Sequence, residues 1–205
     1  KVGNYLYFNS ARGDDLASID LRKDVFVTYT IIERYIDSDV KLWGKDFGIL
    51  RGVFGSLGFF AENNRIKIYN LENPSKITKI TEIDGYSDLF IDKTKKIALF
   101  FNDNLISKFS LANYNNGHNN GQDKGENKPV KILDKKIDLK NKQIFFGENH
   151  FFILADKEIA VYHIEGLDNI FNIKLTFDEP FVVRDIVSKE KKVFILDSRR
   201  GGGAH

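Results

Sequence analysis

The sequence predicts an all-β fold, and three observations support this prediction. Apolar residues of the 205-residue chain come in short runs rich in β-branched and aromatic side chains, such as Leu57-Gly58-Phe59-Phe60, which favour strands. Each run is bounded within a few residues by Asn, Asp, Gly or Lys, and none continues at helical spacing for the roughly 11 residues of an average helix. Finally, one pattern of paired strands recurs along the chain.

The recurring pattern is a strand with apolar residues at its first, fourth and sixth positions. Four copies begin at Leu16, Ile66, Ile106 and Ile159, and each follows an aromatic strand and a short polar turn. Their spacing of about 40 to 50 residues is typical of the blades of a β-propeller. Apolar residues on both faces of these strands suit sheets sandwiched between neighbouring sheets. We therefore predict a β-propeller-like domain over residues 1–200 with four to five antiparallel, four-stranded blade units, open or incomplete as the chain stands.

The blade units are expected at residues 1–40, 47–83, 86–138, 142–177 and 181–198. The first unit lacks its first strand, and its segment 30–40 fits either a strand or one face of a helix. Asn63-Asn64 suits a tight turn with positive φ inside the second unit. The remaining units are expected to hold strands at 49–54, 57–61, 66–71 and 77–83; at 86–91, 96–102, 106–111 and 130–137; at 143–147, 150–155, 159–164 and 171–177; and at 181–187 and 192–197.

Two segments lie outside this pattern. Residues 112–128 are poor in hydrophobic residues and rich in Asn, Gly and charge, which predicts a flexible low-complexity insertion in a surface loop. The tail at residues 201–205 reads as a linker into a tag. Because the chain starts at Lys1 without an initiator Met and enters a strand within a few residues, we expect it to be a piece of a longer parent chain.

Composition narrows the classes of partner and cofactor. The 31 Lys and Arg residues and 29 Asp and Glu residues leave a formal charge of only +2, and the two signs alternate along the chain, so no nucleic acid partner is expected. Cysteine is absent, which excludes disulfides, thiolate catalysis and cysteine-based zinc sites. No run reaches the ~18 apolar residues of a membrane span. We expect neither a cofactor nor a metal.

Arg12-Gly13-Asp14 is the sharpest short motif, because it falls where two predicted strands turn back on each other. An exposed Arg and Asp on either side of a Gly-permitted turn can offer a guanidinium to a carboxylate and a carboxylate to a receptor-bound cation. Integrin ligands have this form. The same residues also suit an ordinary charged hairpin turn, in which Gly supplies the backbone geometry and Asp the hydrogen bond.

Other candidate side chains are weaker. Trp43, the only Trp, lies in a polar-flanked connection, where it can anchor a partner or pack over a blade edge. The four histidines show no metal-ligand spacing. The carboxylates fit turns, and their spacing along the chain cannot establish a catalytic pair. We find no phosphate-binding loop, nucleophile elbow or calcium loop.

One blade unit resembles the LVIVP-type repeat of bacterial and archaeal β-propeller proteins. The matching residues are Gly58-Phe59-Phe60-Ala61-Glu62-Asn63-Asn64, then Ile66-Lys67-Ile68-Tyr69-Asn70-Leu71-Glu72-Asn73-Pro74, followed by Asp84-Gly85-Tyr86-Ser87-Asp88-Leu89. The other units agree with this family in strand pattern only. The resemblance implies a propeller fold and a surface or extracytoplasmic binding role, and it brings no catalytic residues.

The sequence thus predicts a non-catalytic binding or scaffold module that presents its blade loops to a protein partner at the cell surface or in an extracytoplasmic compartment. The candidate binding residues are Arg12, Gly13, Asp14 and Trp43. One alternative is an adhesin that binds host receptors through the Arg12-Gly13-Asp14 tip. The other is a propeller-type hydrolase or lyase, which would need at least two carboxylates with perturbed pKa values at one site.

Overall fold

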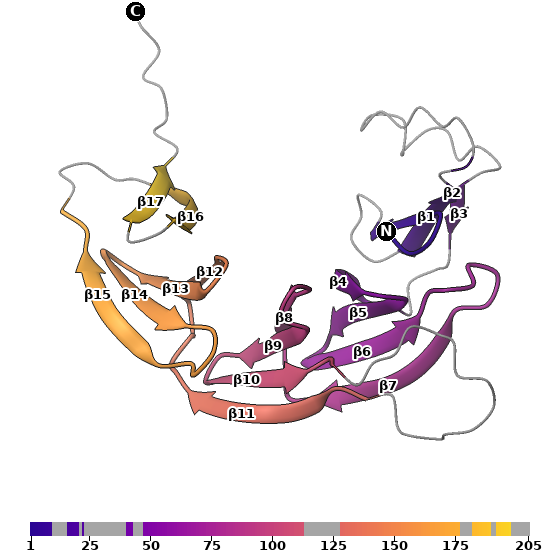
Figure 1. Cartoon of the computed structure of the whole chain (residues 1–205), viewed down its shortest axis with the longest axis horizontal. Helices are drawn as coiled ribbons and strands as arrows, with labels where there is room; N and C mark the ends of the chain where they lie inside the picture. The colour runs from indigo at the N-terminus through magenta and orange to yellow at the C-terminus, as the bar shows by residue number, and fades with distance from the viewer. Residues whose placement is uncertain are drawn as a thin grey trace, which may run out of the picture. The chain divides into compact units, whose positions relative to one another are not determined.

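The computed structural model describes residues 1–9, 16–20, 22, 40–42, 47–112, 128–176, 182–189 and 192–197. Every regular element in these ranges is a β-strand, and the strands β1 to β17 form five antiparallel sheets of three, four, four, four and two strands. In each sheet, strands that follow one another in sequence lie side by side (Figure 1). The all-β prediction is confirmed.

The first sheet has the order β1 (Tyr5–Asn9), β2 (Leu16–Asp20) and β3 (Val40–Leu42). Strand β3 starts at Val40, the last residue of the segment 30–40, for which the sequence was compatible with either a strand or a helix. The rest of that segment lies outside the described residues. Tyr7 of β1 is buried and donates a hydrogen bond from its hydroxyl to the Leu71 carbonyl oxygen at 2.8 Å. Burial, with a smaller contribution from Tyr5, raises the pKa of Tyr7 to about 12.

The two central sheets follow the predicted strands closely. The two-residue turn before β6 has positive φ at both Asn63 and Asn64, which confirms the turn prediction. The second sheet comprises β4 (Ile49–Phe54), β5 (Leu57–Glu62), β6 (Arg65–Asn70) and β7 (Thr78–Asp84). The third comprises β8 (Asp88–Asp92), β9 (Ile97–Asn102), β10 (Leu105–Ser110) and β11 (Val130–Lys136).

The last two sheets complete the described fold. The fourth comprises β12 (Gln143–Phe146), β13 (His150–Ala155), β14 (Glu158–His163) and β15 (Asn169–Lys174). The fifth has two described strands, β16 (Val183–Lys189) and β17 (Lys192–Asp197). Strand β15 begins two residues before the predicted 171–177, and its register with β14 shifts between Val161 and Tyr162.

The chain divides into two compact units, each with its own apolar core. Unit 1 contains Lys1–Asn102 and Ile106–Asp134, and unit 2 contains Asp103–Leu105 and Lys135–His205. In unit 1, one core cluster joins the first two sheets through buried residues that include Tyr7, Leu16 and Phe60. In unit 2, the corresponding cluster joins the fourth and fifth sheets. Its buried members are Phe152, Ile159, Val161, Leu175, Val183 and Ile186.

Several predicted features lie outside the described residues. They are Arg12, Gly13, Asp14 and Trp43, nearly all of the insertion at 112–128, and the tail at 201–205. Where the chain is described, it contains no helix long and apolar enough to span a membrane.

Candidate functional site

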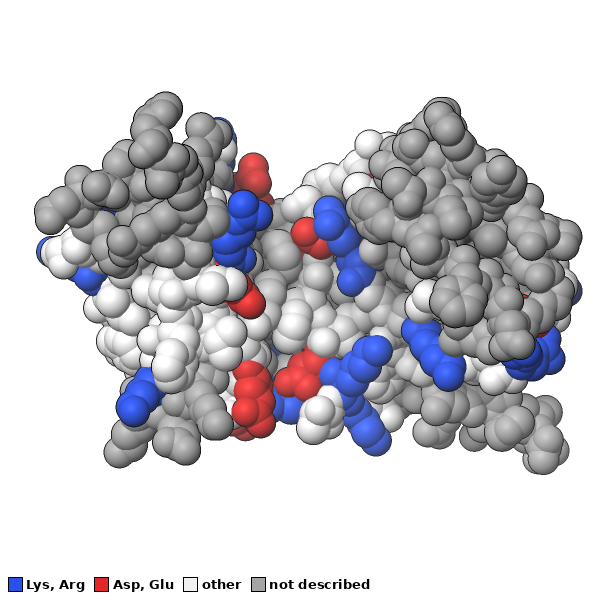
Figure 2. Space-filling model, turned by 90° about the horizontal axis from the view of Figure 1, so that it is seen from above, with Lys and Arg blue, Asp and Glu red and all other residues white. Residues whose placement is uncertain are grey.

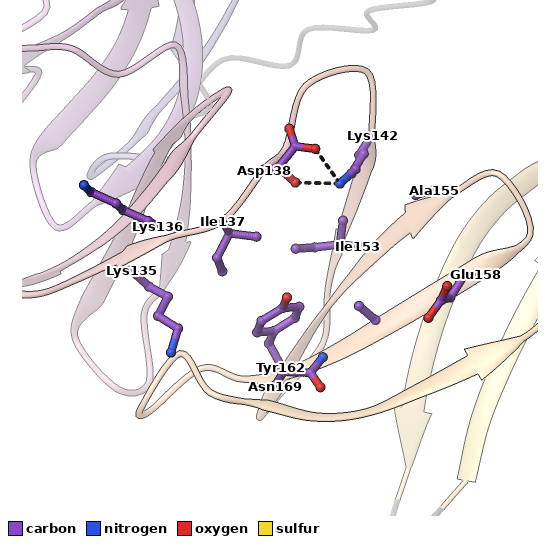
Figure 3. Close-up of a pocket in the computed structure, with 11 residues that line it drawn as sticks. Lys135, Lys136, Ile137, Asp138, Lys142, Ile153, Ala155, Glu158, Tyr162 and Asn169 are labelled. Carbon is purple, nitrogen blue, oxygen red and sulfur yellow. Dashed lines mark hydrogen bonds and ion pairs between the residues drawn. The ribbon is translucent and has the colours of Figure 1, made fainter.

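A cavity of about 370 Å³ opens on one face of the fourth sheet, within unit 2. In Figure 3, Ile137, Ile153 and Tyr162 point toward a common space, whereas Lys136 points away from it. The cavity is lined by Lys135, Lys136, Ile137, Asp138, Lys142, Ile153, Ala155, Glu158, Ala160, Tyr162 and Asn169.

The apolar part of the lining comes from the central hairpin of this sheet. Side chains alternate between the faces of a strand, so Ile153 and Ala155 of β13 share a face with Ala160 and Tyr162 of β14. The register confirms this, because Ile153 pairs with Ala160. Tyr162 stacks on Phe151 with a centroid distance of 4.9 Å and an interplanar angle of 13°, which fixes its ring at the cavity wall.

The rim of the cavity is polar and carries both signs of charge. Lys142 lies 2.9 Å from the Asp138 carboxylate and also donates to the Asp138 carbonyl oxygen (Figure 3). The hydrogen bond from Lys142, followed by one from the Lys140 backbone, lowers the pKa of Asp138. Lys135 lies 3.6 Å from Asp168. The rim can therefore hold a polar peptide backbone or charged side chain while the apolar wall takes a hydrophobic group.

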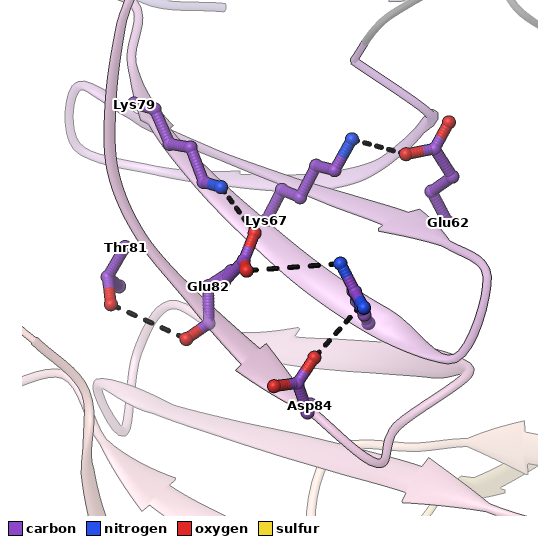
Figure 4. A network of polar contacts seen from close by, with 7 residues as sticks. Glu62, Lys67, Lys79, Thr81, Glu82 and Asp84 are labelled. Carbon is purple, nitrogen blue, oxygen red and sulfur yellow. Dashed lines mark hydrogen bonds and ion pairs between the residues drawn. The ribbon is translucent and has the colours of Figure 1, made fainter.

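The second sheet fills the corresponding space with charged side chains. Residues 57–71, 97–111 and 150–164 align without a gap, so Glu62 and Lys67 correspond to Ala155 and Ala160. The Lys67 ammonium donates to the Glu62 carboxylate, and this hydrogen bond is the main cause that raises the pKa of Lys67 (Figure 4). Arg65 extends the network, lying 3.0 Å from Asp84.

The third sheet fills the same positions with neutral polar side chains. Asn102 donates to the Gly85 carbonyl oxygen at 2.6 Å. Ser107 is fully buried; it accepts a hydrogen bond from the Tyr86 hydroxyl at 2.7 Å and donates to the Asp134 carboxylate at 2.5 Å. Asn102 and Ser107 each have a hydrogen-bond partner, as the buried Ser107 hydroxyl requires.

At three aligned positions that line the cavity, the fourth sheet has smaller apolar side chains than the polar or aromatic ones of the other two sheets. Ala155 and Ala160 carry no atom beyond Cβ, and Ile153 stands where the other two sheets have Phe60 and Phe100. The cavity thus arises where three large or polar side chains are replaced by smaller apolar ones. The sequence analysis did not identify these residues as a candidate site. The ungapped alignment of the three segments does show that smaller side chains stand at these positions in the fourth sheet.

On the face of the molecule seen in Figure 2, the described charged side chains do not gather into one patch of a single sign. Figure 2 shows Lys and Arg (blue) beside Asp and Glu (red) among the coloured side chains of the face in view. Several are paired, as in the contact of Arg51 with Asp88 at 3.2 Å.

Two of the histidines meet in unit 2. His150 and His163 are opposite each other in the β13–β14 register, with ring centroids 4.9 Å apart. Within the described ranges, no group of three or more His, Asp or Glu side chains is arranged to hold a metal ion.

No family model matches the chain, and neither does any curated protein. Solved structures do. Hsv2 from Kluyveromyces lactis, a β-propeller, is 15% identical and matches with a TM-score of 0.56, covering 95% of this chain and 56% of that chain. A second structure of this Hsv2 with its complete loop 6CD gives 15% identity, a TM-score of 0.55, and coverage of 95% and 55%.

A third similar structure is PorZ, described as an essential bacterial surface component of the type-IX secretion system of Porphyromonas gingivalis. It is 14% identical, with a TM-score of 0.47, and the match covers 95% of this chain and 22% of that chain. The chain spans about half the length of the Hsv2 structures. Its fold is β-propeller-like.

Proposed function

We propose that this chain is a non-catalytic binding module of the propeller type, whose cavity in unit 2 takes an apolar side chain from a protein partner. The observation that carries the proposal is that Ala155 and Ala160 stand at positions that larger or polar side chains fill in the second and third sheets, which share the strand plan of the fourth. Concave, mostly apolar pockets with a few convergent polar groups are the usual form of a binding site.

The size of the cavity suits a peptide side chain better than a large ligand. Its volume of about 370 Å³ lies near the lower end of the range for small-molecule pockets. The wall of Ile137, Ile153 and Tyr162 provides apolar contact, and Lys142, Asp138 and Asn169 at the rim offer hydrogen bonds to a peptide backbone. Such a site binds through burial of one anchor side chain.

The test uses a display library of random peptides selected against the whole chain. The affinity of a selected peptide is then measured by fluorescence anisotropy for the unmodified chain and for Ala155→Glu/Ala160→Lys. This double variant installs the pair that already folds at the aligned positions of the second sheet, so it fills the cavity with a side-chain arrangement known to the fold. We expect its affinity to fall by more than about tenfold, the effect of losing one buried anchor.

The matched control is Glu62→Ala/Lys67→Ala, which removes the same two side chains from the second sheet and leaves the cavity untouched. It should bind the selected peptide as the unmodified chain does. The proposal would be contradicted if the selected peptide bound the unmodified chain and the cavity-filled variant with equal affinity. It would also be contradicted if the library yielded no peptide whose binding is weakened in that variant.

The adhesin alternative through Arg12-Gly13-Asp14 stays a prediction, because these residues lie outside the described part of the chain. It differs from the cavity proposal in one measurable respect. Attachment through Asp14 depends on divalent cations and is lost in Asp14→Glu, whereas binding in the cavity depends on neither.

A further inference from the structure

Two imidazole side chains meet at the open end of the central hairpin of the fourth sheet. His150 is the first residue of β13 and His163 is the last residue of β14, and the register places them opposite each other. Their ring centroids are 4.9 Å apart, with an interplanar angle of 49°. His150 is half-buried and His163 is exposed, so an ion in solution can reach them. We call these two residues the histidine pair.

The backbone hydrogen bonds around the histidine pair determine how closely its side chains approach. The His150 carbonyl oxygen accepts a hydrogen bond from the Gly147 amide at 2.8 Å, and the His163 amide donates to the Asp168 carbonyl oxygen at 3.0 Å. Both backbones therefore bond away from each other. This makes the histidine pair a non-hydrogen-bonded pair of the antiparallel ladder, the position at which facing side chains come closest. Facing β-carbons in such ladders are about 4.5–5.5 Å apart.

The distance between the two rings matches the distance that one bound metal ion requires. An imidazole nitrogen lies about 2.0–2.1 Å from a bound zinc ion, so the ion lies about 3.2 Å from the centre of each ring. At a tetrahedral angle the two ring centres are then about 5.2 Å apart, close to the 4.9 Å observed. A histidine ring turns easily about its second side-chain torsion, so a nitrogen of each ring can face the ion with both strands in place.

The aligned hairpins have no imidazole at these positions. In the ungapped alignment of the three hairpins, the histidine pair corresponds to Leu57 and Asn70 in the second sheet, which also pair in register. In the third sheet it corresponds to Ile97 and Ser110. Leu57 and Ile97 are buried, so an aliphatic side chain serves for packing at the first position. The strand plan of these sheets therefore does not call for the two histidines.

The histidine pair lies on the opposite face of the hairpin from the cavity. Because side chains alternate along a strand, His150 shares its face with Phe152, whereas Ile153 and Ala155 line the cavity. Among the described residues, no further His, Asp or Glu side chain joins the histidine pair in a group of three that could hold a metal ion. The histidine pair thus offers two nitrogen ligands, and it does not share the residues of the cavity.

We propose that the histidine pair binds one divalent late first-row transition metal ion, such as Zn²⁺, through one nitrogen of each ring. Neutral imidazole is the commonest metal ligand in proteins. It suits zinc, copper and nickel, whereas magnesium and calcium prefer oxygen ligands. The hairpin holds both rings on one face before the ion binds, so binding costs little free energy of ordering. Two protein ligands leave the other coordination positions of the ion to water.

The experiment titrates the whole chain with Zn²⁺ by isothermal titration calorimetry, with and without an excess of Mg²⁺. We expect one Zn²⁺ to bind per chain, and Mg²⁺ not to displace it. His150→Leu/His163→Asn replaces the histidine pair by the residues that already fold at the aligned positions of the second sheet. Its affinity for Zn²⁺ should be lower by more than about tenfold, because two linked ligands bind one ion more tightly than separate ones.

The matched control is His118→Asn/His205→Asn, which removes the other two histidines of the chain. It should bind Zn²⁺ as the unmodified chain does. The proposal is overturned if the unmodified chain binds no Zn²⁺, if the variant without the histidine pair binds it as tightly, or if the control loses the binding.

Urea unfolding followed by circular dichroism gives a second readout and checks that each variant is folded. Because the pairing of β13 with β14 brings the two rings together, the ion binds the folded chain and should raise its urea midpoint. The midpoint of His150→Leu/His163→Asn should not change with Zn²⁺, and an equal rise in both chains would contradict the proposal. This variant should bind a peptide selected for the cavity with unchanged affinity, so the metal site and the cavity are tested separately.

Discussion

The second and fourth sheets share one backbone plan. They differ in the side chains on one face, which carries Lys67 in the second sheet and Ala160 in the fourth. Both have a central hairpin of two six-residue strands joined by a two-residue turn. In the second sheet, Phe60 and the Glu62–Lys67 pair occupy the face. In the fourth, Ile153 and two alanines leave a cavity.

This difference teaches that a repeat can gain a cavity by losing side-chain volume, with no change in the length of the hairpin strands. The backbone hydrogen bonds of the hairpin maintain the fold in either case, so side-chain volume at a few positions is free to vary. The comparison also predicts that substitutions in the two sheets should affect different properties of the chain. Changes in the filled sheet should lower stability, and changes in the open sheet should alter binding.

The largest effect is expected from Phe60→Ala in the filled sheet. Phe60 is fully buried and contacts Phe47 and Tyr69 with centroid distances of 5.8 and 5.4 Å. The free energy of unfolding should fall by about 3–5 kcal/mol, the usual cost of truncating a buried Phe. Urea unfolding followed by circular dichroism measures it. The aligned variant Ile153→Val should cost no more than about 1.5 kcal/mol, and equal losses would contradict the comparison.

Ser107→Ala should have the next largest effect. It leaves the Tyr86 hydroxyl and one Asp134 oxygen without the hydrogen bonds they now share with Ser107. We expect a loss of about 1–3 kcal/mol in the free energy of unfolding, the cost of leaving a buried polar group without a partner. The reverse change at the aligned position, Ala160→Ser, should stay within about 0.5 kcal/mol because its hydroxyl faces an open cavity. A larger cost for Ala160→Ser would show that the cavity is closed to water.

Ala155→Glu/Ala160→Lys should change stability less than either. The new pair occupies a cavity that is open to water, and ion pairs that water can reach contribute about 0–1 kcal/mol. The urea midpoint of this variant should therefore stay close to that of the unmodified chain while peptide affinity falls. A variant that unfolds at much lower urea would mean that the open face of the fourth sheet cannot accommodate the pair found in the second.

The smallest effect is expected from the ion pair at the cavity rim. Lys142 holds the pKa of Asp138 below its ordinary value of 3.8, so the Asp138 carboxylate stabilises the folded chain above pH 3.8 and this contribution is lost as the pH falls through the lowered pKa. Asp138→Asn should be slightly less stable than the unmodified chain at neutral pH. The difference should disappear in acid, and urea midpoints at both pH values check this. If the stability difference between Asp138→Asn and the unmodified chain grew as the pH fell, the prediction would be contradicted.

Much of the fold could be predicted from the sequence, because strands and turns depend on local patterns. Alternation of apolar residues located the strands of the second sheet to within a residue or two, and Asn63-Asn64 marked its turn. The start of β15 was placed two residues too late, and no local pattern in the sequence marks the register shift opposite Tyr162.

The sequence by itself determined the strands, the turns and the order in which they pair, since each depends on residues close together in the chain. Only the tertiary structure decided which of these faces are filled and which are open. The cavity requires Ile137 and Lys142 to lie near Ile153 and Ala160, and these meet only when the connection between β11 and β12 packs beside the hairpin.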